Sequence, residues 1–211
     1  GIGAITRDTT SVTLGDVDGD GDLDLVTGNY NQANRLYYND GVGDPFDSLD
    51  SWDITTDAHN TTSVALGDMD GDGDLDLVVG NYGEANRMYL NDGVGHPFDT
   101  LGSSTISADT HDTRSVALGD VDSDGDLDVV AGNWNQPNWL YRHSGGGVFA
   151  KSDITTDAHY TWSVALGDMD NDGDLDVVAG NGASQANRLY YNDGAGDPFN
   201  TLGGDNISAD G

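Results

Sequence analysis

The sequence predicts an all-β fold built from four tandem, four-stranded units of the β-propeller blade type. Three features support this prediction. One motif recurs four times, short alternating apolar segments surround each copy, and no segment has a helical period of convincing length. Four short strands in roughly 50 residues match the size of one propeller blade. We therefore expect residues 1–211 to form a single repeat domain.

The recurring motif has the pattern Gly-Asp-x-Asp-x-Asp-Gly-Asp-Leu-Asp. Its copies are spaced by 52, 52 and 48 residues and begin at Gly15, Gly67, Gly119 and Gly167. A second block of the type Asn-Arg-Leu-Tyr follows each motif, first at residues 34–37. We expect residues 205–211 to begin a fifth linking strand, after approximate repeats at 1–52, 53–104, 105–152 and 153–204.

Each repeat contains the signals of several short strands, which the second repeat illustrates. Residues 63–66 alternate before the aspartate-rich segment and residues 75–80 alternate after it, while residues 87–90 form a third candidate. The Asn-Asp-Gly that follows favours a hairpin turn, because these residues tolerate positive φ. The β-branched segment 53–56 is the fourth candidate. The third repeat departs from the pattern with Arg-His-Ser-Gly at 142–145.

The chain is strongly acidic. It has 38 acidic residues against 7 basic ones and a formal net charge of -31, and Glu84 is its single glutamate. Because aspartate favours turns and caps, we expect this charge to lie in loops. The lack of a basic patch argues against nucleic acid and against an anionic membrane surface as partners. The chain has no cysteine and no apolar run long enough for direct membrane insertion.

The aspartate-rich segments have the ligand spacing of a calcium loop. Carboxylates at alternate positions converge as the chain curls, and calcium accepts many oxygen ligands in irregular geometry, whereas magnesium demands a strict octahedron. In the first loop we expect the carbonyl of Asp22 to join four side-chain ligands. Gly21 would permit the bend, and Leu23 would point into the core. The predicted metal residues of this loop are Asp16, Asp18, Asp20, Asp22 and Asp24.

The other three loops repeat this set, which predicts about one calcium ion per repeat and four in total. The corresponding residues are Asp68, Asp70, Asp72, Asp74 and Asp76; Asp120, Asp122, Asp124, Asp126 and Asp128; and Asp168, Asp170, Asp172, Asp174 and Asp176. An EF-hand is rejected, because its loop needs a bidentate glutamate at the twelfth position. That position holds Thr27, Val79, Ala131 and Ala179.

The combination of these motifs resembles the FG-GAP or VCBS repeat family. The matching pattern is Val-Ala-Leu-Gly-Asp-x-Asp-x-Asp-Gly-Asp-Leu-Asp-Val-Val-x-Gly-Asn, followed by Asn-Arg-Leu-Tyr-x-Asn-Asp-Gly, and it covers nearly the whole chain. The integrin α-subunit propeller carries the same class of calcium loop, as do some fungal and bacterial lectins. The resemblance implies propeller blades, calcium at these loops and extracellular work in adhesion or recognition.

We therefore expect a calcium-binding extracellular repeat module with a structural or adhesive role. Its partners would be calcium and further copies or repeats, either in a closed ring, in an open array or in a head-to-tail filament. The alternative function is a glycan-binding lectin-type propeller. Catalysis is not expected, because no nucleophile with a base and no acid pair stands apart from the repeated loops; the prediction is that this is not an enzyme.

A few residues outside the loops are also candidates. Aromatic side chains that follow the second strand could stack on sugars, although packing between blades is the favoured interpretation; they are Tyr30, Tyr82 and Trp134. His96 and His143 occur at unrepeated positions and are expected to be exposed. Glycosylation acceptor patterns begin at Asn60 and Asn206.

Overall fold

The computed structural model describes residues 6–43, 46, 51–98, 103–145, 147–194, 198–199 and 204–207. These residues form 16 strands and no helix, which confirms the all-β prediction. The strands join into one sheet in which every pairing is antiparallel. A helix suited to crossing a bilayer is accordingly not found in the described part of the chain.

Consecutive strands pair in four groups, which we call units 1 to 4. Unit 1 contains β1 (Thr9–Gly15), β2 (Asp24–Gln32), β3 (Arg35–Tyr37) and β4 (Ser51–Asp53). Unit 2 contains β5 (His59–Gly67), β6 (Asp76–Glu84), β7 (Arg87–Tyr89) and β8 (Ser103–Thr105). Unit 3 contains β9 (His111–Gly119), β10 (Asp128–Gln136), β11 (Trp139–His143) and β12 (Phe149–Asp153). Unit 4 contains β13 (His159–Gly167), β14 (Asp176–Asn181), β15 (Arg188–Tyr190) and β16 (Asp205–Asn206).

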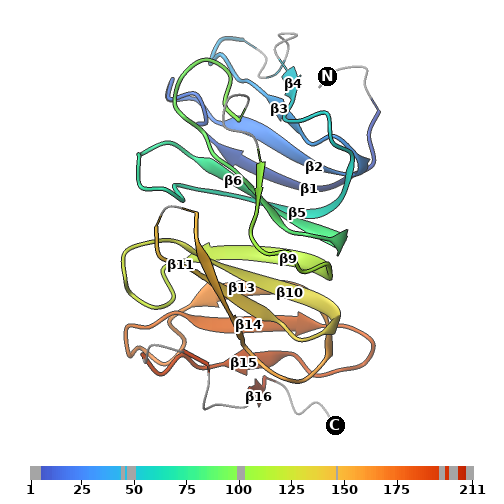
Figure 1. Cartoon of the computed structure of the whole chain (residues 1–211), viewed down its shortest axis with the longest axis vertical. Helices are drawn as coiled ribbons and strands as arrows, with labels where there is room; N and C mark the ends of the chain where they lie inside the picture. Colours follow the sequence, from blue (N-terminus) through green and yellow to red (C-terminus); the bar gives the residue numbers. More distant parts are fainter. Residues whose placement is uncertain are drawn as a thin grey trace.

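The units follow one another in a column, with units 1 and 4 at opposite ends (Figure 1). Neighbouring units are joined where the end of one long strand pairs with the start of the next unit: β2 pairs with β5, β6 with β9 and β10 with β13. The sheet is not closed, because β16 pairs with β15 and not with β1. The described residues thus form an open array. Residues 208–211 of the predicted linking strand lie outside them.

The hydrophobic core lies between the units. Side chains alternate along each long strand, so that Val78 packs toward unit 3 while Leu77 and Val79 pack toward unit 1. Each of the three buried clusters combines side chains from two neighbouring units. A unit therefore has two apolar faces, and stacking is what removes them from water.

Glycines allow the units to approach closely. A Cβ atom on Gly15 would lie 2.8 Å from the Cδ1 atom of Leu75 in unit 2, and Gly67 and Gly119 face leucines of the following unit in the same way. Leu23 was expected to point into the core, and this expectation is wrong, because its side chain is 56% exposed. Its counterpart Leu75 is partly buried against the core that units 1 and 2 share, and no described unit precedes unit 1.

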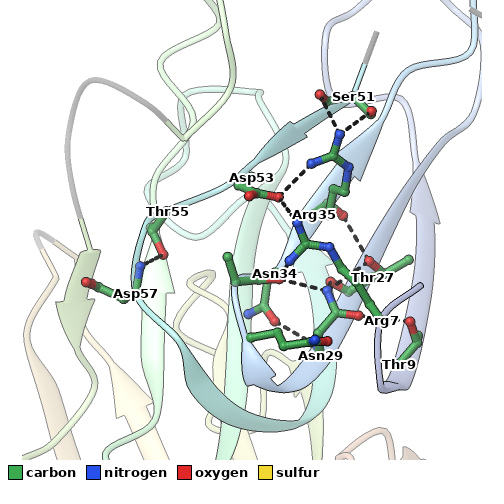
Figure 2. A network of polar contacts seen from close by, with 12 residues as sticks. Arg7, Thr9, Thr27, Asn29, Asn34, Arg35, Ser51, Asp53, Thr55 and Asp57 are labelled. Carbon is green, nitrogen blue, oxygen red and sulfur yellow. Dashed lines mark hydrogen bonds and ion pairs between the residues drawn. The ribbon is translucent and has the colours of Figure 1, made fainter. Parts of the chain in front are cut away.

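The outer edge of unit 1 also differs from the sequence prediction. A strand was expected at residues 53–56, whereas β4 ends at Asp53 and Ile54 turns into the core between units 1 and 2. The β-branched residue that suggested a strand is thus a buried anchor, and its N–H donates to the Asn34 carbonyl at 2.9 Å. Asp53 Oδ1 accepts from Arg7 at 2.6 Å and from Arg35 at 2.7 Å, which ties β4 to the rest of the unit (Figure 2).

Two buried asparagines shape the tight connection between β2 and β3. The Asn29 N–H donates to Asn34 Oδ1 at 2.9 Å (Figure 2), and Asn29 Nδ2 donates to the Ala33 carbonyl at 2.8 Å. The connection between β2 and β3 is short, and these side-chain hydrogen bonds supply partners for its buried backbone groups. The same N–H to Oδ1 bond recurs in units 2 to 4 between Asn81 and Asn86, Asn133 and Asn138, and Asn181 and Asn187.

Candidate metal centres

Each aspartate-rich loop connects the first two strands of its unit and is held by its own carboxylates. In unit 1 the Gly21 N–H donates to Asp16 Oδ2 at 3.0 Å, and the Asp20 N–H donates to Asp18 Oδ1 at 3.2 Å. Gly21 has a φ of 97°, a conformation that favours glycine. The loops share one bend, because φ is 99°, 97° and 101° at Gly73, Gly125 and Gly173.

This bend brings three carboxylates of every loop together. One oxygen from each of the three lies within 4.8 Å of the others. The groups are Asp16, Asp18 and Asp24; Asp68, Asp70 and Asp76; Asp120, Asp122 and Asp128; and Asp168, Asp170 and Asp176. They contain neither histidine nor cysteine, so the donors are the hard oxygens that calcium prefers and not the nitrogen and sulfur ligands of zinc.

The last aspartate of each group opens the second strand and is fully buried. Asp24 Oδ2 accepts from the Val17 N–H at 3.0 Å, and its Oδ1 accepts from the Asn39 N–H at 2.9 Å. This carboxylate therefore ties the loop to the segment after the third strand. The same pair of bonds recurs in the other units at Asp76, Asp128 and Asp176.

The other predicted residues lie beside these groups. Asp20 Oδ1 accepts from the Asp22 N–H at 2.9 Å. The Asp22 carboxylate points at the Asn-Asp-Gly turn, since a Cβ atom on Gly41 would lie 2.0 Å from its Oδ2. A carbonyl role for Asp22 and its counterparts stays a prediction, as does side-chain coordination by Asp20, Asp72, Asp124 and Asp172.

Burial and crowding make the charged form of these carboxylates unfavourable. Burial raises the pKa of Asp76 and Asp128 to about 6, and the other carboxylates of their loops add to the rise. Burial likewise raises the pKa of Asp18, Asp24 and Asp122. A divalent cation among three such oxygens would offset both effects, which is the physical reason that the groups fit a metal ion.

The FG-GAP-like repeat family matches three overlapping stretches, residues 16–79, 68–131 and 120–179. Each stretch begins in one aspartate-rich loop and ends within the second strand of the next unit, and together the three stretches cover most of the chain. This chain belongs to the FG-GAP-like repeat family. The match confirms the resemblance drawn from the motifs.

Curated relatives cover a smaller part of the chain. Cartilage acidic protein 1 of Mus musculus is 35% identical over 78 residues, which are 37% of this chain and 12% of that protein. Cartilage acidic protein 1 of Homo sapiens is 33% identical over 78 residues, with the same coverage. The chain therefore spans 12% of the length of the curated relatives that it matches.

Solved structures share the fold. A chain of the crystal structure of BBS1N in complex with ARL6DN superposes with a TM-score of 0.57 at 10% identity, covering 90% of this chain and 56% of that one. The V. cholerae biofilm matrix protein Bap1 superposes with a TM-score of 0.52 at 20% identity, covering 90% of this chain and 30% of that one. At these identities the likeness concerns the arrangement of strands.

Aromatic side chains contact one another and Arg114 across units 2, 3 and 4. The Arg114 guanidinium lies 4.5 Å from the ring centroid of Tyr82 and 5.5 Å from that of Trp134. Trp134 in turn meets the ring of Trp162 at 4.6 Å. These contacts join units 2, 3 and 4, as expected of packing aromatics, whereas Tyr30 of unit 1 is 40% exposed.

Sequence reasoning missed a cavity between units 1 and 2. The rings of Trp52 and His96 lie 4.2 Å apart. The cavity beside them has a volume of about 350 Å³ and is lined by Asp18, Asp20, Tyr38, Asn39, Asp40, Trp52, Gly95 and His96. The sequence held one signal for this cavity, because Trp52 and His96 both depart from the repeat pattern. The structure shows that these two unrepeated side chains contact each other.

The structure also places His143 and the two predicted glycosylation patterns. His143 was expected to be exposed, and this is wrong: it is 1% exposed, because it ends β11 and packs on Phe149 with ring centroids 4.8 Å apart. Of the glycosylation patterns, Asn60 is half-buried in β5 and Asn206 is exposed in β16. Ser208, the third residue of the second pattern, lies outside the described residues.

Proposed function

We propose that this chain is a calcium-binding structural module, made of four propeller-type blades, that works outside the cell without a catalytic role. The observation that carries the proposal is that each of the four units holds a group of three carboxylates at the equivalent position. Like-charged side chains at this spacing are unfavourable unless a cation lies among them. An extracellular setting suits the proposal, because calcium there is abundant enough to keep weak sites filled.

Filled sites would supply much of the stability. When free calcium exceeds the dissociation constant about a hundredfold, each independent site adds roughly 2.7 kcal/mol to the free energy of unfolding. Four such sites would contribute about 11 kcal/mol, which is comparable with the total stability of an ordinary domain. Calcium in this role is a structural staple and not a signal.

Isothermal titration calorimetry of the metal-stripped chain tests the proposal. We expect about four calcium ions per chain, with magnesium binding far more weakly. Asp70→Asn should remove one ion, because Asp70 belongs to a carboxylate group, and Asp40→Asn should leave the stoichiometry unchanged, because Asp40 is exposed outside the loops. Absence of calcium uptake at millimolar concentration would refute the proposal.

An adhesive or filament-forming role is supported by the two outer faces of the column. Unit 1 exposes Val12 (60%) and Leu14 (56%), whose counterparts in units 2 to 4 pack on the preceding unit. Unit 4 exposes Met169 (54%), whose counterparts Val17 and Met69 are buried by the following unit. Each outer face therefore exposes the apolar side chains that bury one another at the junctions between units. A second copy could continue the stack head to tail.

Electron microscopy in millimolar calcium, with and without a chelator, tests this assembly. Regular filaments that dissociate on chelation would support it. Discrete single particles at every concentration, together with an unchanged sedimentation coefficient for Leu14→Asp, would contradict it, because that substitution charges the contact face.

Glycan binding is the second candidate function, and the cavity beside Trp52 favours it. Trp52 is 49% exposed and could stack on a sugar ring, while Asn39 and Asp40 offer hydrogen-bonding groups for hydroxyls. A glycan array with Trp52→Ala tests this candidate. The control is Trp162→Ala, which removes a similarly exposed indole far from the cavity. Equal array signals for both variants would exclude the cavity as the site.

A further inference from the structure

One buried side chain connects the metal loops of units 1 and 2. Asn91 follows β7 and is 1% exposed. Its N–H donates to Asp76 Oδ1 at 2.8 Å, and its Nδ2 donates to the Val17 carbonyl at 2.8 Å. Asp76 belongs to the carboxylate group of loop 2, whereas Val17 lies between Asp16 and Asp18 in loop 1. A single asparagine thus contacts both loops.

The same connection joins units 3 and 4. The Asn192 N–H donates to Asp176 Oδ1 at 2.8 Å, and its Nδ2 donates to the Val121 carbonyl at 2.7 Å. Asn192 is 2% exposed. Its Oδ1 accepts from the Gly194 N–H at 3.0 Å, so that the amide orientation is held from both sides. The corresponding bond at Asn91 is also 3.0 Å long.

Units 2 and 3 lack this connection. His143 occupies the equivalent position, and its N–H still donates to Asp128 Oδ1 at 2.8 Å. Its ring, however, accepts from the Gly147 N–H at 3.1 Å and packs on Phe149. No hydrogen bond within the described part of the chain joins His143 to Met69, the counterpart of Val17. Packing of the loop residue against the next unit occurs at all three junctions, so the asparagine bond is what distinguishes them.

We propose that Asn91 and Asn192 are positioning residues that couple the metal loops in two pairs, loop 1 with loop 2 and loop 3 with loop 4. The inference rests on the calcium binding proposed above. An ion in loop 2 fixes the Asp76 carboxylate, which fixes the Asn91 backbone and its side-chain bond to loop 1. Loop 1 then loses less conformational freedom when its own ion binds, and the effect is reciprocal.

The experiment follows each loop separately by NMR during a calcium titration of the full chain. The amides of Gly21, Gly73, Gly125 and Gly173 donate to the first aspartate of their own loops and therefore report occupancy loop by loop. Asp70→Asn weakens loop 2 without touching Asn91. We expect it to lower the calcium affinity of loop 1 by about three- to tenfold, the range of one buried hydrogen bond, and that of loop 3 by less than about twofold.

Matched variants separate coupling from general stability. In an Asn91→Ala background, Asp70→Asn should no longer affect loop 1. Asn39→Ala is the control, because the Nδ2 of this counterpart donates to its own loop, at the Leu23 carbonyl, and its Oδ1 accepts from Gly41 of the same unit. Asn91→His copies the residue of unit 3 and should uncouple loop 1 in the same way, which covers the case that the alanine variant folds poorly.

Three results would overturn the pairing. Loop 1 could keep its affinity when loop 2 is weakened, loop 3 could respond as strongly as loop 1, or Asn91→Ala could leave the response intact. Four independent loops that all take up calcium would overturn the pairing and leave the proposed function standing. If no loop takes up calcium, the proposed function itself fails.

Discussion

Removal of calcium should reverse the sign of the pH dependence of stability. In the metal-free protein, burial raises the pKa of Asp76 and Asp128 from 3.8 to about 6. A carboxyl group whose pKa is higher in the folded state stabilises the fold while it is protonated, and this stability is lost as the pH rises through the folded pKa. The metal-free protein should therefore be most stable near pH 4 and lose stability up to about pH 7.

The size of the effect follows from the two shifts. A rise from 3.8 to about 6 corresponds to roughly 3 kcal/mol for each carboxyl group. The side chains of Asp76 and Asp128 are fully buried, but the loop residues that precede them are exposed. Screening by solvent therefore reduces the contribution of each carboxyl group to about 2 kcal/mol. We expect the free energy of unfolding of the metal-free chain to fall by about 4 kcal/mol between pH 4 and pH 8.

Bound calcium should give the opposite slope. The ion requires ionised ligands, so protons compete with it and its contribution grows as the pH rises through the range in which Asp76 and Asp128 titrate. Urea denaturation followed by circular dichroism, at several pH values in metal-stripped buffer and in millimolar calcium, measures both slopes. Asp76→Asn should remove about half of the metal-free slope. A metal-free protein whose stability increases steadily from pH 4 to pH 8 would refute this account of the carboxylate groups.

Three further predictions concern packing and metal choice. Gly15→Ala should destabilise the chain by about 1–3 kcal/mol, because its Cβ would lie 2.8 Å from Leu75. Gly167→Ala, whose Cβ would have no described atom within 4 Å, should change the free energy of unfolding by less than about 0.5 kcal/mol. Urea denaturation compares the two variants. Leu75→Ala should lose about 2 kcal/mol and Leu23→Ala almost nothing, and equal losses would contradict the stacking argument. Magnesium at the concentration that saturates the chain with calcium should raise the melting temperature much less, as thermal scans will show.

The repeated local features could be predicted from the sequence. The aspartate-rich loops, the alternating strands around them and the all-β fold all follow from motifs that recur with the same chemistry. Grouping of Asp16, Asp18 and Asp24 agrees with their spacing and with the bend at Gly21. These features depend on residues within a few positions of one another, and this is why the sequence alone is sufficient for them.

Features that depend on a neighbouring unit could not be predicted in the same way. Leu23 and Leu75 occupy the same position of the same motif, yet only Leu75 is covered by a preceding unit. Asn39 and Asn91 likewise share one motif, and only Asn91 has the carbonyl of an earlier loop within reach. The burial of His143 required knowledge of β11 and β12, which are longer than their counterparts in the other units, so that His143 pairs with Phe149.

The proposed metal binding and the stacking of the units involve the same short segment of each loop. Val17 stands between two aspartates of the first carboxylate group, and its side chain is 3% exposed in the core that units 1 and 2 share. Met69 and Val121 hold the equivalent places at the next two junctions. An ion that orders a loop therefore also orders the residue that anchors the loop to the next unit. Because linkage is reciprocal, stacking of the next unit should raise the calcium affinity of the loop before it. Loop 4, whose Met169 is 54% exposed, should then bind calcium more weakly than loop 3.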